Sequence, residues 1–159
     1  MPQILVIAFG NPLRSDDGVA WRAAESLKEN VSPSEVEIIC LQQLGPELAE
    51  TASRFECVIF VDAASGSGVP GAVQVRDLSR ANSGPAEPPA FCHALSPTAI
   101  LGMAAQLYGA TAQAYSATVV GQDFDHGEAL SPQVVDALPV LIARIQELIQ
   151  VCLKKNRNS

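Results

Sequence analysis

Positive charge is scarce in this sequence. Ten Lys and Arg residues stand against 17 Asp and Glu, which gives a net charge of −7 over 159 residues. A surface that follows nucleic-acid phosphates needs clustered cations, so we expect no nucleic-acid partner. A net negative surface is also poorly suited to binding anionic membranes. Because 48% of the residues are hydrophobic, the chain can bury a core, and its length fits one domain.

Long hydrophobic runs are missing as well. The first apolar run, Ile4–Phe9, is too short to span a membrane, and no basic segment precedes it as in a signal peptide. The four cysteines show no CxxC spacing, so they do not indicate a zinc knuckle. We therefore predict a cytoplasmic protein with reduced thiols, in which Cys40, Cys57 and Cys152 act as small hydrophobic groups.

Apolar runs alternate with segments of helical periodicity along the chain. The runs that we predict to be strands are 4–9, 36–41, 57–61, 72–76 and 114–120. Helices are predicted from 19 to 27, from 46 to 54, from 96 to about 108 and from 131 onward. This alternation predicts a single three-layer α/β domain, with a central, mostly parallel sheet of about five strands flanked by helices.

One domain is expected to cover residues 1–155, with a disordered tail at 156–159. The only linker-like stretch is the Pro-rich segment at about 81–90. It is short enough to be a mobile loop within the domain rather than a boundary between two domains.

Two acidic residues stand where a site is expected. Asp17 follows the first predicted strand, and Asp62 ends the third. In a flavodoxin-like strand order these strands are neighbours, and sites form outside the carboxyl ends of strands where the order reverses. The two carboxylates could therefore face one crevice. The simpler alternative for Asp16 and Asp17 is that they cap the helix that follows them.

A histidine follows the Pro-rich segment. His93 is one of two histidines and is the natural third ligand beside the two carboxylates, whereas His126 lies in a polar connection typical of a solvated loop. Two Asp and one His offer oxygen and imidazole ligands, which suit a divalent transition metal. The sequence has no GxSxG, P-loop, HExxH or GxGxxG motif, and Cys92 beside His93 would point to the opposite face of an extended chain.

The segment GNPLRSDDG at 10–18, directly after a buried strand, resembles the opening signature of the nickel–iron hydrogenase maturation endopeptidases. The resemblance continues through the strand that ends at Asp62, the stretch His93–Leu95 and the segment Gly127–Val134. Proteins of this family remove a short C-terminal extension from the precursor of the hydrogenase large subunit after nickel has been inserted. The resemblance therefore implies a metal-dependent peptidase, similar to the aspartic type, whose partner is that precursor.

The resemblance also implies a set of site residues. The residues matching the family's metal-contacting positions are Asp17, Asp62 and His93. Nickel would be supplied by the substrate, and no organic cofactor is expected. Asp17 and Asp62 are in addition candidates for the catalytic group. The loop that shapes the substrate site would contain Gly10, Asn11 and Asp16, with Gly10 allowing a close approach of the backbone. We expect a monomer.

Two other functions are weighed against this one. A phospho-receiver domain also has acidic residues after its first strand and an Asp closing its third, but it needs a Lys near the end of a late strand. The lysines here are Lys28, Lys154 and Lys155, and none is at that place. A chaperone that binds the nickel-loaded precursor without cutting it stays open, because no residue is uniquely catalytic.

Overall fold

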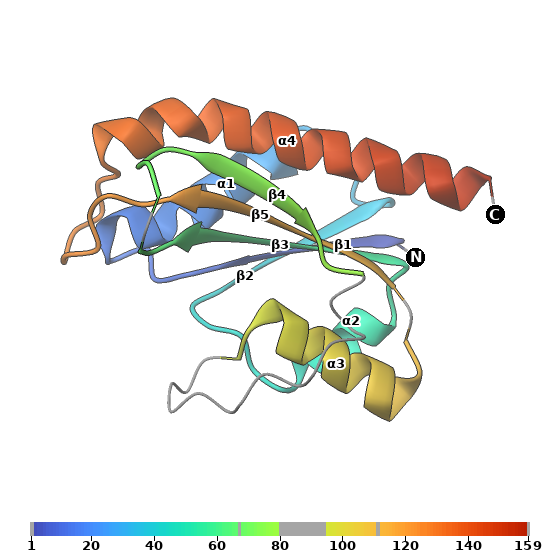
Figure 1. Cartoon of the computed structure of the whole chain (residues 1–159). Coiled ribbons are helices and arrows are strands. Elements are labelled where there is room, and N and C mark those ends of the chain that lie inside the picture. Colours follow the sequence, from blue (N-terminus) through green and yellow to red (C-terminus); the bar gives the residue numbers. More distant parts are fainter. Residues whose placement is uncertain (1, 67, 80–94, 111, 159) are drawn as a thin grey trace.

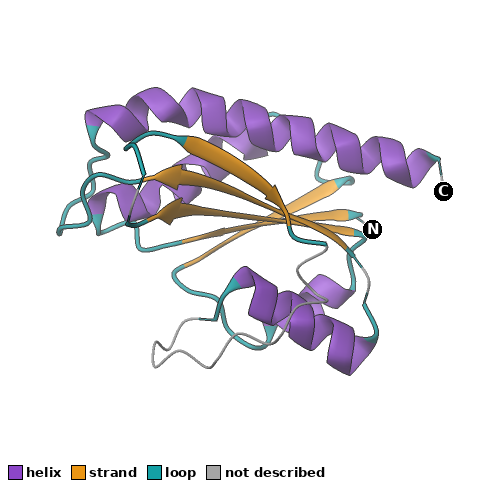
Figure 2. Ribbon diagram, viewed as in Figure 1, coloured by secondary structure: helices purple, strands orange, loops and turns teal. Residues whose placement is uncertain are grey.

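A computed structural model describes residues 2–66, 68–79, 95–110 and 112–158. Helices and strands alternate along these residues, as the sequence predicts (Figures 1 and 2). The strands are β1 (Ile4–Phe9), β2 (Val36–Leu41), β3 (Cys57–Ala64), β4 (Val73–Asp77) and β5 (Gln113–Val120). The helices are the short 3₁₀ helix η1 (Ser15–Gly18), α1 (Val19–Lys28), α2 (Leu48–Ser53), α3 (Pro97–Tyr108) and α4 (Pro132–Arg157).

The five strands form one sheet in the order β2-β1-β3-β5-β4. All neighbouring strands are parallel except β4, which runs antiparallel to β5 at one edge. The predicted single α/β domain with a mostly parallel sheet is thus confirmed. The first and third strands are neighbours, with Ala8 opposite Val61. The carboxyl ends of β1 and β3 therefore lie side by side.

Helices cover both faces of the sheet (Figure 1). In β1, alternate residues point to opposite faces. Ile4, Val6 and Ala8 belong to a core cluster under α1 and α4, whereas Leu5 and Ile7 belong to a second cluster with α2 and α3. All five side chains are fully buried, which explains why this strand is apolar throughout.

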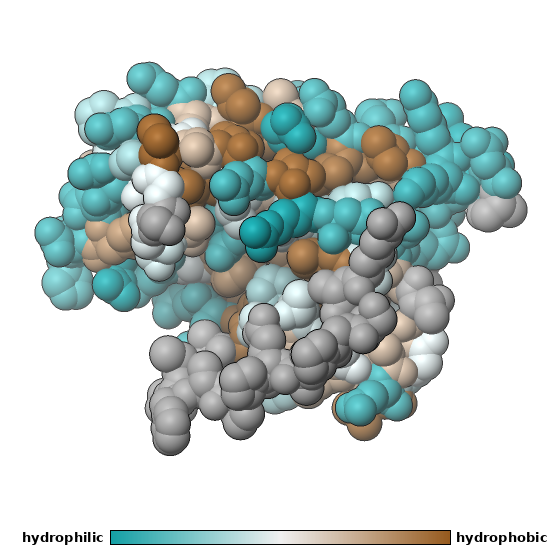
Figure 3. Space-filling view, viewed as in Figure 1, coloured by the Kyte–Doolittle hydropathy of each residue, from teal (hydrophilic) through white to brown (hydrophobic). Residues whose placement is uncertain are grey.

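The outer surface over α4 and β4 is partly apolar. Brown patches interrupt the hydrophilic surface over α4 and β4 (Figure 3). Half-buried Val73 and Val75 of β4, and Leu138 and Ile142 of α4, pack against the first core cluster. No helix within the described residues is both long and apolar enough to cross a membrane.

The ends of two helices differ from the expected boundaries. The helix expected from 46 begins at Leu48. At the other end of the chain, α4 continues to Arg157, into the segment expected to be a tail. Three cations in the last turn of α4 favour this extension, because they face the negative end of the helix dipole. The predicted mobile loop at 81–90 lies outside the described residues.

The prediction of reduced thiols is wrong for two of the cysteines. Cys57, at the start of β3, forms a disulfide with Cys152 of α4. The two residues are 95 positions apart, and each has an exposed fraction of only 1%. They meet because α4 crosses the sheet with Cys152 over the first residue of β3, at a Cα–Cα distance of 6.4 Å. Cys40 of β2 is free and half-buried.

Candidate functional site

Asp17 and Asp62 meet at the carboxyl ends of β1 and β3. Asp62 continues β3 opposite Thr118 of β5, and Asp17 belongs to η1, which lies against β3. Burial raises the pKa of Asp62, and the negative charge of Asp17 raises it further, to about 7. The two carboxylates therefore lie close enough to interact, as the predicted strand order implies.

The raised pKa makes Asp62 a group that exchanges a proton near neutral pH. A side chain whose pKa lies close to the working pH is suited to general acid or base catalysis. It is also suited to bind a cation, because a positive charge between the two carboxylates would replace their mutual repulsion by attraction. The pair can therefore hold a metal-bound substrate, activate a water molecule, or do both.

The loop after β1 is folded around Asp17. The Asn11 backbone N–H donates to Asp17 Oδ2 over 2.7 Å, and the Leu13 N–H donates to Asn11 Oδ1 over 2.9 Å. Gly10 has a φ of 141°, and a Cβ at this position would overlap the backbone carbonyl oxygen of Asp17. The close backbone approach expected of Gly10 is thus present, and it sets the position of Asp17.

Asp16 has a different task from its neighbour. Its side chain is fully buried and accepts four hydrogen bonds from residues more than 100 positions away. Oδ2 accepts from the backbone N–H of Gln122 and of Asp123 and from the Ser131 hydroxyl. Oδ1 accepts from the Ser131 N–H over 2.7 Å. Burial raises the pKa of Asp16, but these bonds outweigh it, so the pKa lies below its ordinary value.

The alternative that Asp16 and Asp17 cap the helix that follows them is wrong. No side chain caps α1, which begins after Gly18. Asp16 instead binds Ser131, the residue that precedes α4. The sequence contains no signal for this pairing, because Asp16 and Ser131 become neighbours only when β5 is inserted beside β3.

A second loop supports the first. The Ser15 N–H donates to the Gly127 carbonyl over 2.7 Å, and the Ser15 hydroxyl donates to the Asp125 carbonyl over 2.8 Å. Arg14 and Gly127 form an isolated parallel bridge. The exposed His126 lies in this second loop, as expected of a solvated connection. The loops after β1 and β5 thus form one hydrogen-bonded unit beside the carboxylate pair.

The third expected ligand, His93, lies outside the described residues, as does Cys92. Within the residues that the structure describes, no three His, Cys, Asp or Glu side chains converge as a metal site. The structure therefore brings together two of the three residues that the sequence singles out.

Comparison with known proteins places this geometry in a known fold. No family model and no curated protein matches the chain. Among solved structures, the hydrogenase maturating endopeptidase HybD from E. coli is similar, with a TM-score of 0.71 and 21% identity over 94% of this chain and 93% of that one. The fold is that of hydrogenase maturation endopeptidases.

Two archaeal proteins give the same result. The nickel–iron hydrogenase maturation protease HycI from Thermococcus kodakarensis has a TM-score of 0.72 and 20% identity, covering 93% of this chain and 92% of its own. The hydrogenase 2 maturation peptidase from a Thaumarchaeota archaeon has a TM-score of 0.67 and 18% identity, covering 92% of this chain and 97% of its own. In all three comparisons the likeness covers more than nine-tenths of this chain.

Proposed function

We propose that this protein is an endopeptidase that removes a C-terminal extension from the nickel-loaded precursor of a nickel–iron hydrogenase large subunit. The observation that carries this proposal is the Asp17–Asp62 pair at the carboxyl ends of β1 and β3, in a fold shared with such peptidases. The nickel belongs to the substrate. In this proposal Asp17, Asp62 and His93 contact it, so that cleavage follows only when the precursor carries its metal.

The chemistry assigned to the pair is hydrolysis of one peptide bond. A water molecule adds to the scissile carbonyl carbon, the C–N bond breaks, and the leaving amine takes up a proton. Asp62 can accept the proton of the water and return it to the amine, because its pKa of about 7 allows both steps near neutral pH. The substrate's nickel would polarise the carbonyl as a Lewis acid. This assignment requires no serine or cysteine nucleophile.

The positions of the lysines argue against the receiver alternative. Lys28 lies in the last turn of α1. Lys155 donates to Gln113 Oε1 over 3.0 Å, at the start of β5 rather than at its end. A receiver needs its Lys beside the acidic residues, at the carboxyl ends of the strands. The proposal of a precursor-binding protein without peptidase activity differs from ours only in whether the bond is cut.

Intact mass spectrometry tests the proposal. Purified protein is incubated with a nickel-loaded large-subunit precursor from the same organism, and in parallel with the nickel-free precursor. We expect loss of a C-terminal peptide only from the loaded sample. Asp62→Asn should abolish this loss, whereas Asp136→Asn, at an exposed position of α4, should leave it unchanged.

Other outcomes separate the alternatives. Cleavage of both precursors would support the peptidase activity and contradict the proposal that these residues make cleavage depend on nickel. Formation of a stable complex without cleavage would favour the binding protein. Absence of both cleavage and complex would contradict the proposed function.

A further inference from the structure

The sheet has an open edge at β2. Within the described sheet this strand pairs only with β1. The backbone N–H and carbonyl groups that point toward β1 are those of the odd-numbered residues, 35 to 41. The Glu35 carbonyl accepts from the Ile4 N–H, and the Leu41 carbonyl accepts from the Gly10 N–H. Because backbone groups alternate along a strand, those of Val36, Ile38 and Cys40 point away from the sheet. In the described part of the chain, no backbone or side-chain group pairs with the outward side of Ile38 or Cys40.

This edge has few of the features that usually protect a free strand. Natural edge strands carry charges, proline or bulges that prevent another strand from pairing with them. Here four consecutive half-buried residues, Ile38–Leu41, are apolar, and Glu37 is the only charged residue of β2. The opposite edge, β4, alternates valine with exposed Gln74 and Arg76 and ends in exposed Asp77. The two edges therefore differ, and β2 is the one suited to accept a strand.

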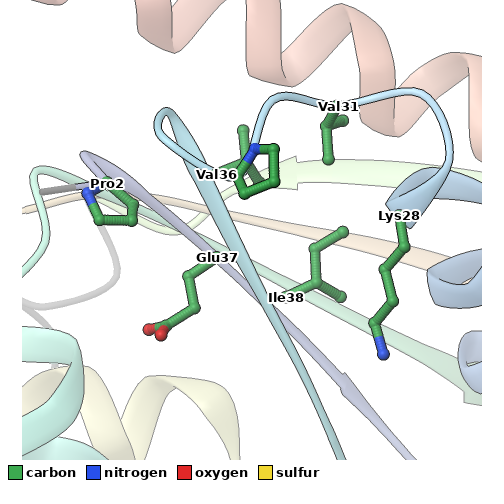
Figure 4. A pocket seen from close by; sticks show the side chains of 7 residues that line it. Pro2, Lys28, Val31, Val36, Glu37 and Ile38 are labelled. Carbon is green, nitrogen blue, oxygen red and sulfur yellow. The ribbon is translucent and has the colours of Figure 1, made fainter.

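A pocket of about 340 Å³ lies beside the first half of β2 (Figure 4). Val36 and Ile38 line it from the strand, Val31 lines it from the preceding loop, and Lys28 lines it from the end of α1. Its volume is at the lower end of the range for ligand pockets. An apolar side chain of a paired strand would find an apolar wall here. Glu37 also lines the pocket. Lys28, which belongs to neither ion pair of the described residues, is the cationic group there that would favour a nearby carboxylate.

The other end of β2 leads to the carboxylate pair. The Leu41 carbonyl accepts from the Gly10 N–H and from Trp21 Nε1. Gly10 in turn lies against the backbone of Asp17. A polypeptide that leaves the carboxylate pair on this side thus arrives at the end of β2. If it continues along the edge, it runs from Leu41 toward Val36, which is antiparallel to β2.

We propose that the β2 edge binds the extension of the precursor as an added antiparallel strand. This inference rests on the proposed function. About six residues after the scissile bond would pair with Ile38 and Cys40, place an apolar side chain in the pocket, and bring an acidic side chain or the terminal carboxylate to Lys28. A second copy of this chain is the less suitable occupant, because each copy carries a net charge of −7.

The direct test is an NMR titration with the peptide that is released in the mass experiment. The peptide is added, as a synthetic product, to the full chain labelled with ¹⁵N. We expect the amide signals of residues 36–41 to shift, and those of β4 to stay. Only alternate amides of the bound peptide would face β2. N-methylation of the set that faces β2 should therefore abolish binding, and N-methylation of the other set should leave binding unchanged. NMR shifts confined to other elements, or an equal loss of binding by both N-methylated peptides, would overturn the proposal.

A pair of variants tests the edge in the reaction itself. Ile38→Pro removes one outward N–H, and proline is tolerated on edge strands. We expect the KM for the nickel-loaded precursor to rise by about tenfold or more, with little change in kcat. The matched control is Val75→Pro on β4, whose backbone also points outward because the Leu78 N–H and the Ala72 carbonyl bond β5. It should change neither constant by more than about twofold.

The source of the carboxylate is tested on the same peptide. Lys28→Glu should weaken binding of the peptide, and amidation of its C-terminus should remove this difference if the terminal carboxylate is the group bound. If the difference persists after amidation, an acidic side chain is bound.

The outcomes also separate this proposal from the one before it. Normal cleavage by a folded Ile38→Pro variant with unchanged KM would overturn the edge proposal and leave the peptidase intact. A protein that neither cleaves nor binds the precursor would overturn both. A concentration-dependent dimer that protects the β2 amides without peptide would show that the edge pairs two copies.

Discussion

At the scale of single residues, two aspartates near the proposed site have opposite properties. Asp16 is fully buried, yet four hydrogen bonds keep the pKa of its carboxyl low. Asp62, which faces Asp17, has the pKa of its carboxyl raised by burial and by the Asp17 charge. The first arrangement stabilises the fold at neutral pH, and the second costs stability there. Their pH dependences should therefore have opposite signs.

The Asp62→Asn variant should be more stable than the wild type at high pH. In the unfolded chain Asp62 ionises near pH 3.8, but in the folded protein it ionises near pH 7. The charged form is thus disfavoured by folding, and the wild type should lose about 1–4 kcal/mol relative to the variant as pH rises through this window. Urea unfolding of both proteins with a chelator present, at about pH 4 and about pH 8, measures this difference in the free energy of unfolding. An equal stability of both proteins at both pH values would contradict the assigned repulsion.

The Asp16→Ala variant should be destabilised by about 3 kcal/mol or more, because it leaves three N–H groups and the Ser131 hydroxyl without their acceptor. Asp16→Asn keeps one acceptor oxygen but turns an amide toward the donors, so its loss should also be substantial. Because the folded pKa is low, the deficit is expected in full above about pH 4 and should shrink in stronger acid. Asp136→Ala is the exposed control. Thermal unfolding that ranks the two alanine variants equally would contradict this role.

At the scale of elements, α4 is fixed at two points, one on η1 and one on the sheet. Near its first residue, Ser131 binds Asp16, and near its last turns Cys152 is linked to Cys57 of β3. Between these points its apolar stripe packs on β5 and α1. The helix that ends the chain thus holds both the loop unit of the site and the start of the third strand.

Replacement of both Cys57 and Cys152 by alanine should lower the free energy of unfolding by about 2–4 kcal/mol, since the link closes a long loop in the unfolded chain. Wild-type protein in reductant should approach the same value. The double variant should be insensitive to reductant, whereas Cys40→Ala, which removes the free thiol of β2 and keeps the disulfide, should lose stability in reductant as the wild type does. Urea titrations of the three proteins with and without dithiothreitol measure the effect. If reductant leaves the wild type unchanged, the two thiols are not linked in solution.

At the scale of the whole molecule, the parallel order of strands assembles the site. The meeting of Asp17 with Asp62 could be predicted, because apolar runs locate the strands and the carboxyl ends of neighbouring parallel strands coincide. The hydrogen bonds between Asp16 and Ser131 could not be predicted, because the sequence around Ser131 indicates only the start of a helix. The disulfide was missed for a similar reason, because a cysteine within an apolar stripe has the same pattern as any small hydrophobic residue. Both contacts join residues far apart in the sequence, and they form only when the whole sheet and α4 are assembled.

The His93→Ala variant tests the third proposed contact within this whole. We expect it to abolish processing of the nickel-loaded precursor while circular dichroism and thermal unfolding stay at wild-type values. His126→Ala is the matched control, because His126 is exposed in the loop after β5. Processing at the normal rate by the His93 variant would contradict the proposed nickel contact.

The anchoring of Asp16 limits how the loop after β1 can be redesigned. Its carboxylate is fixed from four directions, and the next residue inherits its position from that anchor. Asp17→Glu would therefore lengthen the reach of the carboxylate proposed to contact nickel by one methylene without displacing the backbone. An insertion or deletion of a single residue between Gly10 and Asp16 would instead shift the sequence by one place, so that only one of the two positions would still carry a carboxylate. An engineer can thus vary the side chain at position 17, but must keep the length of the loop.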